Sequence, residues 1–145
     1  MNDELIKKLH SLAQLDRDAV TVYDDALKRV TNDDVRSHYV EFRDEHAHHV
    51  TAISEAIVRL GGTELELKVD AMGTMAGWAV SFQSSLGAKG PLHAMHTAEE
   101  YHNSRYKEAA GWTVDDTQLA ADLKVFYGEE QRHLSYISER LAVKA

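Results

Sequence analysis

The sequence predicts an all-α fold, a bundle of four antiparallel helices with one long crossover connection. The chain has a single proline and no strand-like alternation of polar and apolar residues. Apolar residues recur instead at the heptad spacing of amphipathic helices. A length of 145 residues allows one substantial core, so we expect residues 1–145 to form a single domain.

The first two helices are expected to form a hairpin. The first runs from about Asp3 to Val30. Thr31 and Asp34 have the spacing of a capping box and therefore predict the start of the second helix. Gly61-Gly62 predicts its end. The short turn makes the two helices antiparallel neighbours.

A second hairpin is expected near the C-terminus. Its first helix starts at Pro91, a residue favoured at the first helical position, and runs to about Ala110. Thr113 and Asp116 repeat the capping pattern before the fourth helix, which reaches about Leu141.

The connection between the hairpins spans residues 61 to about 90. Its apolar residues predict a short extra helix, weakened by glycines: Met72, Met75, Ala79, Phe82 and Leu86. Exposed apolar residues in this crossover would suit a homodimer.

Composition excludes several classes of partner. The formal net charge of -8 argues against nucleic-acid binding and against an anionic membrane surface. The chain has no cysteine, which excludes disulfides and thiolate metal sites. It also shows no secretion signal and no apolar segment long enough to span a bilayer. We therefore expect a cytoplasmic protein with neither nucleic acid nor membrane as partner.

The two hairpins resemble copies of each other. When the second helix is shifted by 84 residues along the sequence, Phe42 aligns with Phe126 and His49 with His133. When the first helix is shifted by 83 residues, Tyr23 aligns with Tyr106. Heptad patterning alone can produce so faint a repeat, so the matching polar positions carry more weight.

Polar side chains interrupt the apolar stripes near the middle of all four helices. Asp16 and Glu99 each lie one heptad before a tyrosine. The second and fourth helices place two polar residues between Phe and Ile on their stripes. The candidate metal ligands are Asp16, His46, His49, Glu99, Glu130 and His133.

Burying these groups without compensation would cost several kcal/mol per charge. A metal ion compensates, because oxygen and imidazole ligands suit iron, manganese and zinc. Glu130 and His133 lie three residues apart on one helix face, roughly 4.5 Å along the axis, and can approach one metal together.

This pattern resembles the ferritin-like superfamily of di-iron carboxylate proteins, which includes bacterioferritin and rubrerythrin. That family supplies one acidic residue from each of two helices and Glu-x-x-His from each of the other two. The resemblance covers nearly the whole chain. It implies terminal ligands at Asp16 and Glu99, a bridging ligand at Glu130, and nitrogen donors at His46, His49 and His133.

The second helix departs from the family pattern, because His46 stands where a bridging glutamate is usual. Glu45 and His48 form a literal Glu-x-x-His one residue earlier, but they fall beside the apolar stripe. Helical phase therefore favours His46 and His49. This substitution makes a histidine-rich pair or a single metal credible alternatives to a full di-iron site.

Other polar and aromatic residues receive plainer interpretations. We expect Tyr23 and Tyr106 to be core aromatics, with hydrogen bonding to ligand carboxylates as the functional alternative. Four further residues are expected to be solvated or peripheral: His48, His96, Glu100 and His102.

Two functional hypotheses follow. The first is a ferritin-like protein that binds iron, as a di-iron centre or a single ion, or manganese, and acts on oxygen or peroxide as an oxidase, peroxidase or ferroxidase. The second is a non-enzymatic helical bundle, a stress-associated or interaction protein, whose polar cluster holds structural zinc or stays vacant.

Overall fold

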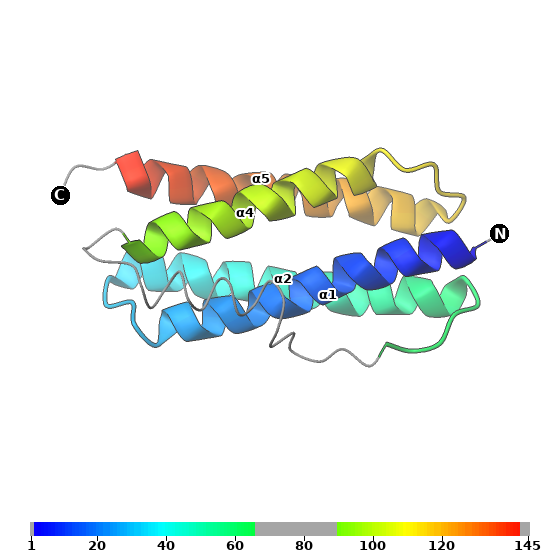
Figure 1. Cartoon of the computed structure of the whole chain (residues 1–145), viewed down its shortest axis with the longest axis horizontal. Coiled ribbons are helices and arrows are strands. Elements are labelled where there is room, and N and C mark those ends of the chain that lie inside the picture. The colour runs from blue at the N-terminus through cyan, green and yellow to red at the C-terminus, as the bar shows by residue number, and fades with distance from the viewer. Residues whose placement is uncertain (1, 66–89, 143–145) are drawn as a thin grey trace. The chain divides into compact units, whose positions relative to one another are not determined.

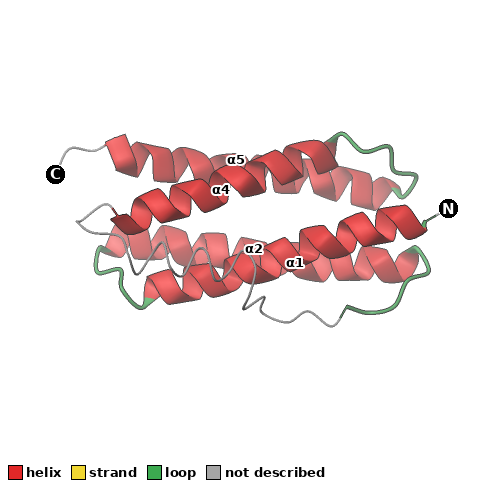
Figure 2. Cartoon of the chain, in the orientation of Figure 1, coloured by secondary structure: helices red, strands yellow, loops and turns green. Residues whose placement is uncertain are grey.

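The computed structural model describes residues 2–65 and 90–142. Over these residues the chain forms four α-helices (Figures 1 and 2): α1 Asp3–Leu27, α2 Asp33–Arg59, α4 Gly90–Ala110 and α5 Thr117–Ala142. The predicted all-α class is confirmed for this part of the chain. None of the described helices has the length and apolar character that a membrane span requires. The extra helix expected between residues 72 and 86 lies outside the described residues.

The described helices belong to two compact units, one containing α1 and α2 and the other α4 and α5. In the first unit α1 and α2 pack against each other as an antiparallel hairpin (Figure 1). Tyr23 is an aromatic centre of this packing, with its ring edge-on to Tyr39 at 5.2 Å and to Phe42 at 6.2 Å. All three side chains are buried. The apolar stripes predicted from heptad spacing therefore meet inside this hairpin.

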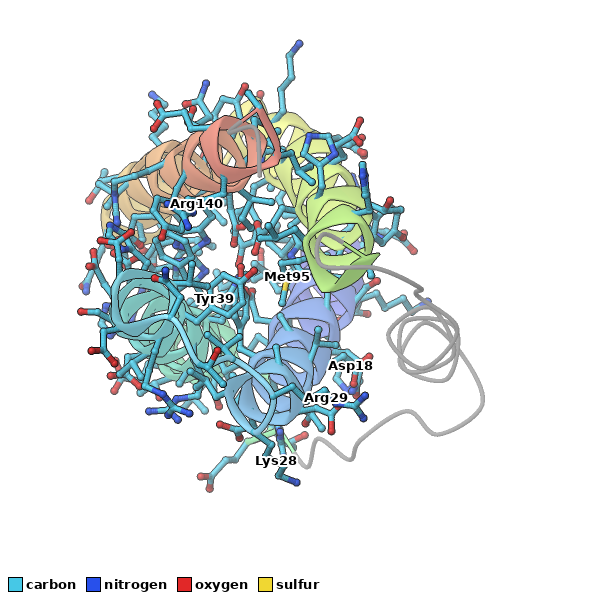
Figure 3. The ribbon with its side chains drawn as sticks, turned by 90° about the vertical axis from the view of Figure 1, so that its left-hand side faces the viewer. Asp18, Lys28, Arg29, Tyr39, Met95 and Arg140 are labelled. Atoms are coloured by element: carbon cyan, nitrogen blue, oxygen red, sulfur yellow. The ribbon has the colours of Figure 1, made fainter. Side chains whose placement is uncertain are left out.

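The end of α1 lies at Leu27, earlier than the predicted end at Val30. The guanidinium of Arg36 donates to the Leu27 carbonyl at 2.6 Å and to the Val30 carbonyl at 3.2 Å. The first bond satisfies a carbonyl group of the last helical turn, where no following turn supplies an N–H, and the second holds the chain just beyond the helix. Lys28 and Arg29 follow and project outward (Figure 3).

The start of α2 is capped by Asn32, so the prediction of a cap at Thr31 is wrong. The Asn32 side-chain oxygen accepts the backbone N–H of Val35 at 3.0 Å. A cap must directly precede the first helical residue, here Asp33, for its side chain to reach that N–H. Thr31 stands one residue too early.

The predicted end of α2 at the glycine pair is confirmed. Gly61 has a φ of 94°, in the left-handed region that favours glycine. The Gly62 N–H then donates to the Ile57 carbonyl at 2.9 Å. A Cβ on Gly62 would lie 2.6 Å from Ile57 Cγ2, so the chain passes too close there for a side chain.

In the second unit α4 packs against α5. The Tyr106 and Phe126 rings meet edge-on at 6.3 Å, in the places that Tyr23 and Phe42 take in the first unit. Asp116 caps α5 by accepting the Leu119 N–H at 2.8 Å. Thr113 was predicted as the cap, but α5 begins at Thr117. Thr113 therefore does not directly precede the first helical residue, as a cap must.

Candidate metal centre

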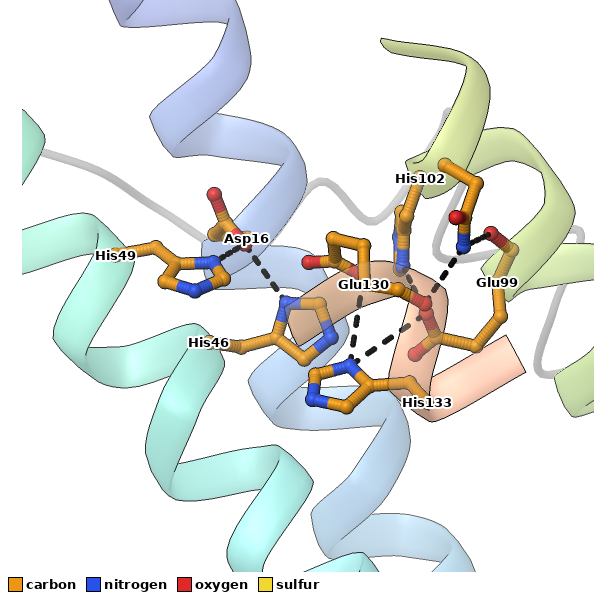
Figure 4. Close-up of polar contacts among 8 residues, drawn as sticks. Asp16, His46, His49, Glu99, His102, Glu130 and His133 are labelled. Atoms are coloured by element: carbon orange, nitrogen blue, oxygen red, sulfur yellow. Dashed lines mark hydrogen bonds and ion pairs between the residues drawn. The ribbon is translucent and has the colours of Figure 1, made fainter. Parts of the chain in front are cut away.

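A polar cluster lies in the first unit, where α1 contributes Asp16 and α2 contributes His46 and His49 (Figure 4). All three side chains are buried, with at most 1% of their surface exposed. Asp16 Oδ1 accepts hydrogen bonds from His46 Nδ1 at 2.7 Å and from His49 Nδ1 at 3.1 Å. A carboxylate can only accept, so these bonds require a proton on both Nδ1 atoms. In the neutral imidazoles the Nε2 atoms then carry the lone pairs.

The ionisation of Asp16 is controlled by its two histidines. Burial alone raises the pKa of this carboxyl group. The charge that His49 carries when it is protonated and the hydrogen bonds from His46 and His49 outweigh burial and hold the pKa of Asp16 below its ordinary value. The Tyr23 ring stacks on His46 with centroids 5.6 Å apart. The first unit therefore presents an ionised carboxylate that orients two imidazole rings.

In metal proteins, a histidine ligand commonly donates its other ring N–H to a carboxylate, which fixes the tautomer and the ring orientation. Asp16 accepts such bonds from both histidines. The potential ligand atoms of Asp16, His46 and His49 all lie within 4.8 Å of one another. The three residues can therefore serve a metal either by direct coordination or with Asp16 in an orienting role. The predicted role of Asp16 as a terminal ligand stays a prediction.

A second polar cluster lies between α4 and α5 in the second unit (Figure 4). His133 Nδ1 lies 3.4 Å from Glu130 Oε2 and 3.7 Å from Glu99 Oε2. On α4, His102 Nδ1 lies 3.6 Å from the same Glu99 oxygen. All four residues are buried, with no more than 1% of their surface exposed.

These distances exceed those of N–H···O hydrogen bonds, about 2.7–3.2 Å. They match the separation of two ligands on one ion. With metal–ligand bonds of about 2.1 Å, ligand atoms lie about 3.4 Å apart at a tetrahedral angle and about 3.6 Å apart at 120°. The second cluster therefore has the spacing of a coordination shell.

Asn103 ties the two helices together beside this cluster. Its side-chain amide donates to the Glu99 backbone carbonyl at 2.9 Å and to the Glu130 backbone carbonyl at 2.8 Å. One side chain thus fixes the main chain at both carboxylate residues. The sequence prediction missed Asn103, because a single asparagine beside an apolar stripe carries no distinctive signal.

The six residues predicted as ligands are all buried, three in each unit: Asp16, His46 and His49 in the first, and Glu99, Glu130 and His133 in the second. The alternative pair on α2 lies differently, since Glu45 is only half-buried and His48 is exposed. Helical phase therefore identified which α2 residues contact Asp16. Whether the six bind metal stays a prediction.

The expectation that His102 is solvated or peripheral is wrong. His102 is 1% exposed and lies beside Glu99. The heptad series that places Glu99 on the buried stripe steps over position 102. A series that steps alternately by four and three residues from Met95 passes through Glu99 and reaches His102. Glu100 is exposed as expected, with 60% of its side-chain surface accessible, and His96 is partly exposed.

The donor chemistry of the clusters fits iron, manganese or zinc. The residues offer carboxylate oxygens and imidazole nitrogens, and the chain has no thiolate to offer. In each unit three such donors come within 4.8 Å of one another. This set suits those metals better than magnesium or calcium, which prefer oxygen ligands throughout.

Comparisons with known proteins support the fold. A family model described as Domain of unknown function (DUF2383) matches residues 4–111. A crystal structure of ferritin-like, diiron-carboxylate proteins from Bacillus anthracis str. Ames matches with a TM-score of 0.75 and 17% sequence identity, over 95% of each chain. At this identity the likeness shows the fold, an all-α, ferritin-like four-helix bundle, and the predicted resemblance is confirmed. None of the curated proteins matches the chain significantly.

Proposed function

We propose that this chain, which belongs to the family described as Domain of unknown function (DUF2383), is a metal-binding protein that holds iron or manganese through its two buried polar clusters. One observation carries the proposal. Carboxylates and imidazoles gather at ligand distances on helix faces that are otherwise apolar, and all of them are shielded from water. Their burial costs several kcal/mol per charge, which a bound cation offsets.

We further propose that the six predicted ligands hold two metal ions when the protein is fully loaded. The ferritin-like fold supports this, because such bundles build their metal sites from side chains of all four helices. The similar crystal structure is described as that of diiron-carboxylate proteins, which favours iron. The presence of a polar cluster in each unit, at matching positions of the internal repeat, agrees with this arrangement.

The residues of the chain have distinct roles in this proposal. Glu99 and Glu130 provide carboxylate oxygens, and His133 provides a nitrogen. Asp16 holds His46 and His49 with their Nε2 atoms available. Burial of every donor keeps bulk water away, which strengthens each electrostatic interaction. When bound, iron or manganese supplies redox and Lewis-acid chemistry toward oxygen or peroxide, as in an oxidase, peroxidase or ferroxidase.

Metal analysis of two variants tests the proposal. The parent chain, purified without chelator or histidine tag and offered Fe²⁺ or Mn²⁺, should retain metal. His133→Ala should lose most of it, whereas His48→Ala, which alters an exposed histidine on α2, should bind like the parent. At free metal of 100 Kd, binding stabilises the parent by about 2.7 kcal/mol, and His133→Ala should lose much of this.

Two results would count against the proposal. A parent chain that retains no metal after both ions have been offered would refute metal binding. Equal metal content and equal metal-induced stabilisation in the parent and in His133→Ala would refute the ligand assignment.

Structural zinc is the second candidate function. The separation of 3.4 Å between His133 Nδ1 and Glu130 Oε2 suits the tetrahedral geometry that zinc prefers. Oxygen or peroxide consumption by the metal-loaded protein separates the two candidates. The redox proposal predicts consumption that depends on iron or manganese and that His133→Ala abolishes. A zinc protein should retain zinc in competition with both ions and show no such activity.

A further inference from the structure

Helix α4 carries a Glu-x-x-His pair of its own. Glu99 and His102 have the same spacing as Glu130 and His133 on α5. Residues three apart share a helix face, and all four side chains are buried. The second unit therefore brings together two Glu-x-x-His pairs, one from each of its helices.

Glu99 Oε2 lies near two imidazole nitrogens. His102 Nδ1 is 3.6 Å away and His133 Nδ1 is 3.7 Å away. Figure 4 shows both histidines directed toward this carboxylate. Both distances are too long for a hydrogen bond and close to the separation of about 3.6 Å expected for two ligands at 120° on one ion. His102 therefore has the same relation to Glu99 as His133, which is already a candidate ligand.

The fold itself does not require a histidine at this position. The shift of 83 that relates α1 to α4 places Ala19 on His102. Ala19 is fully buried, so the first unit fills the equivalent place with a methyl group. An imidazole at position 102 costs desolvation that alanine avoids. A bound cation gives a reason for that cost.

We propose that His102 is a further metal ligand, which donates through Nδ1 to the cation that Glu99 holds. The second unit then offers two carboxylates and two imidazoles, a set suited to iron, manganese, cobalt or zinc. The inference rests on the proposed function, since it assigns one more donor to the same centre. Helix α4 then supplies a nitrogen ligand in addition to the Glu99 carboxylate.

Cysteine substitution with Co²⁺ as the probe tests this assignment directly. The chain has no cysteine, so any thiolate-to-cobalt charge-transfer band in a single-cysteine variant must come from the introduced residue. A cysteine sulfur reaches nearly as far as Nδ1, because the longer metal–sulfur bond of about 2.3 Å compensates for the shorter side chain. The Co²⁺ form of His102→Cys should therefore show the band.

Two matched variants make the result decisive. His133→Cys is the positive control and His48→Cys, at an exposed position, is the negative control. A band in His133→Cys together with none in a folded His102→Cys overturns the inference and leaves the proposed function intact. A parent chain that binds no Co²⁺, together with no band in His133→Cys, overturns the proposed function itself.

A titration provides a second test that does not depend on the cysteine variant folding. His102→Gln keeps much of the side-chain volume but removes the imidazole. Its affinity for Co²⁺ should be at least about tenfold weaker than that of the parent, the lower end of the loss seen when groups around a metal are removed. Affinity equal to that of the parent, in a variant with parental helix content, overturns the assignment of His102.

Discussion

The amide of Asn103 offers the sharpest test of how α4 and α5 are held together. Replacing Asn103 by alanine removes its hydrogen bonds to the Glu99 and Glu130 carbonyls. Each bond contributes about 1 kcal/mol, and the higher helix propensity of alanine returns about 0.5 kcal/mol. The expected net loss is about 1.5 kcal/mol of unfolding free energy, or about 3–6 °C in Tm for a chain of this size.

Urea unfolding followed by circular dichroism measures this loss. Asn103→Asp is the informative companion, because it keeps the shape but directs a carboxylate at two carbonyl oxygens. It should destabilise more than Asn103→Ala. Ser104→Ala, at an exposed position of the same helix, should stay within about 0.5 kcal/mol of the parent. If Asn103→Ala also stays within that margin, the amide does not link the two helices as inferred.

Helix ends give further predictions, all measured by the same unfolding assay. Asn32→Ala and Asp116→Ala should each cost about 1 kcal/mol, because each removes a side-chain cap, whereas Asn32→Asp and Asp116→Asn should stay near the parent. Equal stability of the alanine and the conservative variants would contradict the assigned caps. Gly61→Ala should cost about 1 kcal/mol for its left-handed backbone alone, since a Cβ there meets no atom within 4 Å. Gly62→Ala should cost about 1–3 kcal/mol, because its Cβ collides with Ile57, and a smaller loss than that of Gly61→Ala would contradict the predicted clash.

Much of the helical framework could be predicted from the sequence because heptad spacing responds to burial alone. The tyrosines at 23 and 106 and the phenylalanines at 42 and 126 were placed on apolar stripes, and all four are buried. The end of α2 was also predictable, since few sequences other than a glycine pair permit a left-handed residue followed by a close chain passage.

Helix starts were harder to predict, because several residues near each start can act as caps. At α2, Thr31 and Asn32 are both good capping residues. Only the backbone conformation decides between them, and Asn32 is extended, with ψ at 124°, which places its side chain over the first turn. At α5, Thr113 and Asp116 are likewise both possible capping residues, and Asp116 is the cap. Capping motifs therefore locate a helix start to within a few residues.

The candidate site could be predicted wherever a polar residue falls on a heptad position. Asp16 and Glu99 were found in this way. His102 was missed because its position lies between two heptad steps, and Asn103 because its contacts are with backbone carbonyls, which no side-chain pattern encodes. The residues that support a site are thus less visible in a sequence than those at its centre.

The two units differ in how their buried charges are compensated. In the first, Asp16 receives hydrogen bonds from two imidazoles at 2.7 and 3.1 Å, which offset its burial within the unit. In the second, His133 Nδ1 lies 3.4 Å from Glu130 Oε2 and 3.7 Å from Glu99 Oε2, and His102 Nδ1 lies 3.6 Å from the same Glu99 oxygen. If the proposed metal binds, it therefore meets one carboxylate already held by two imidazoles in the first unit, and two carboxylates with longer imidazole contacts in the second.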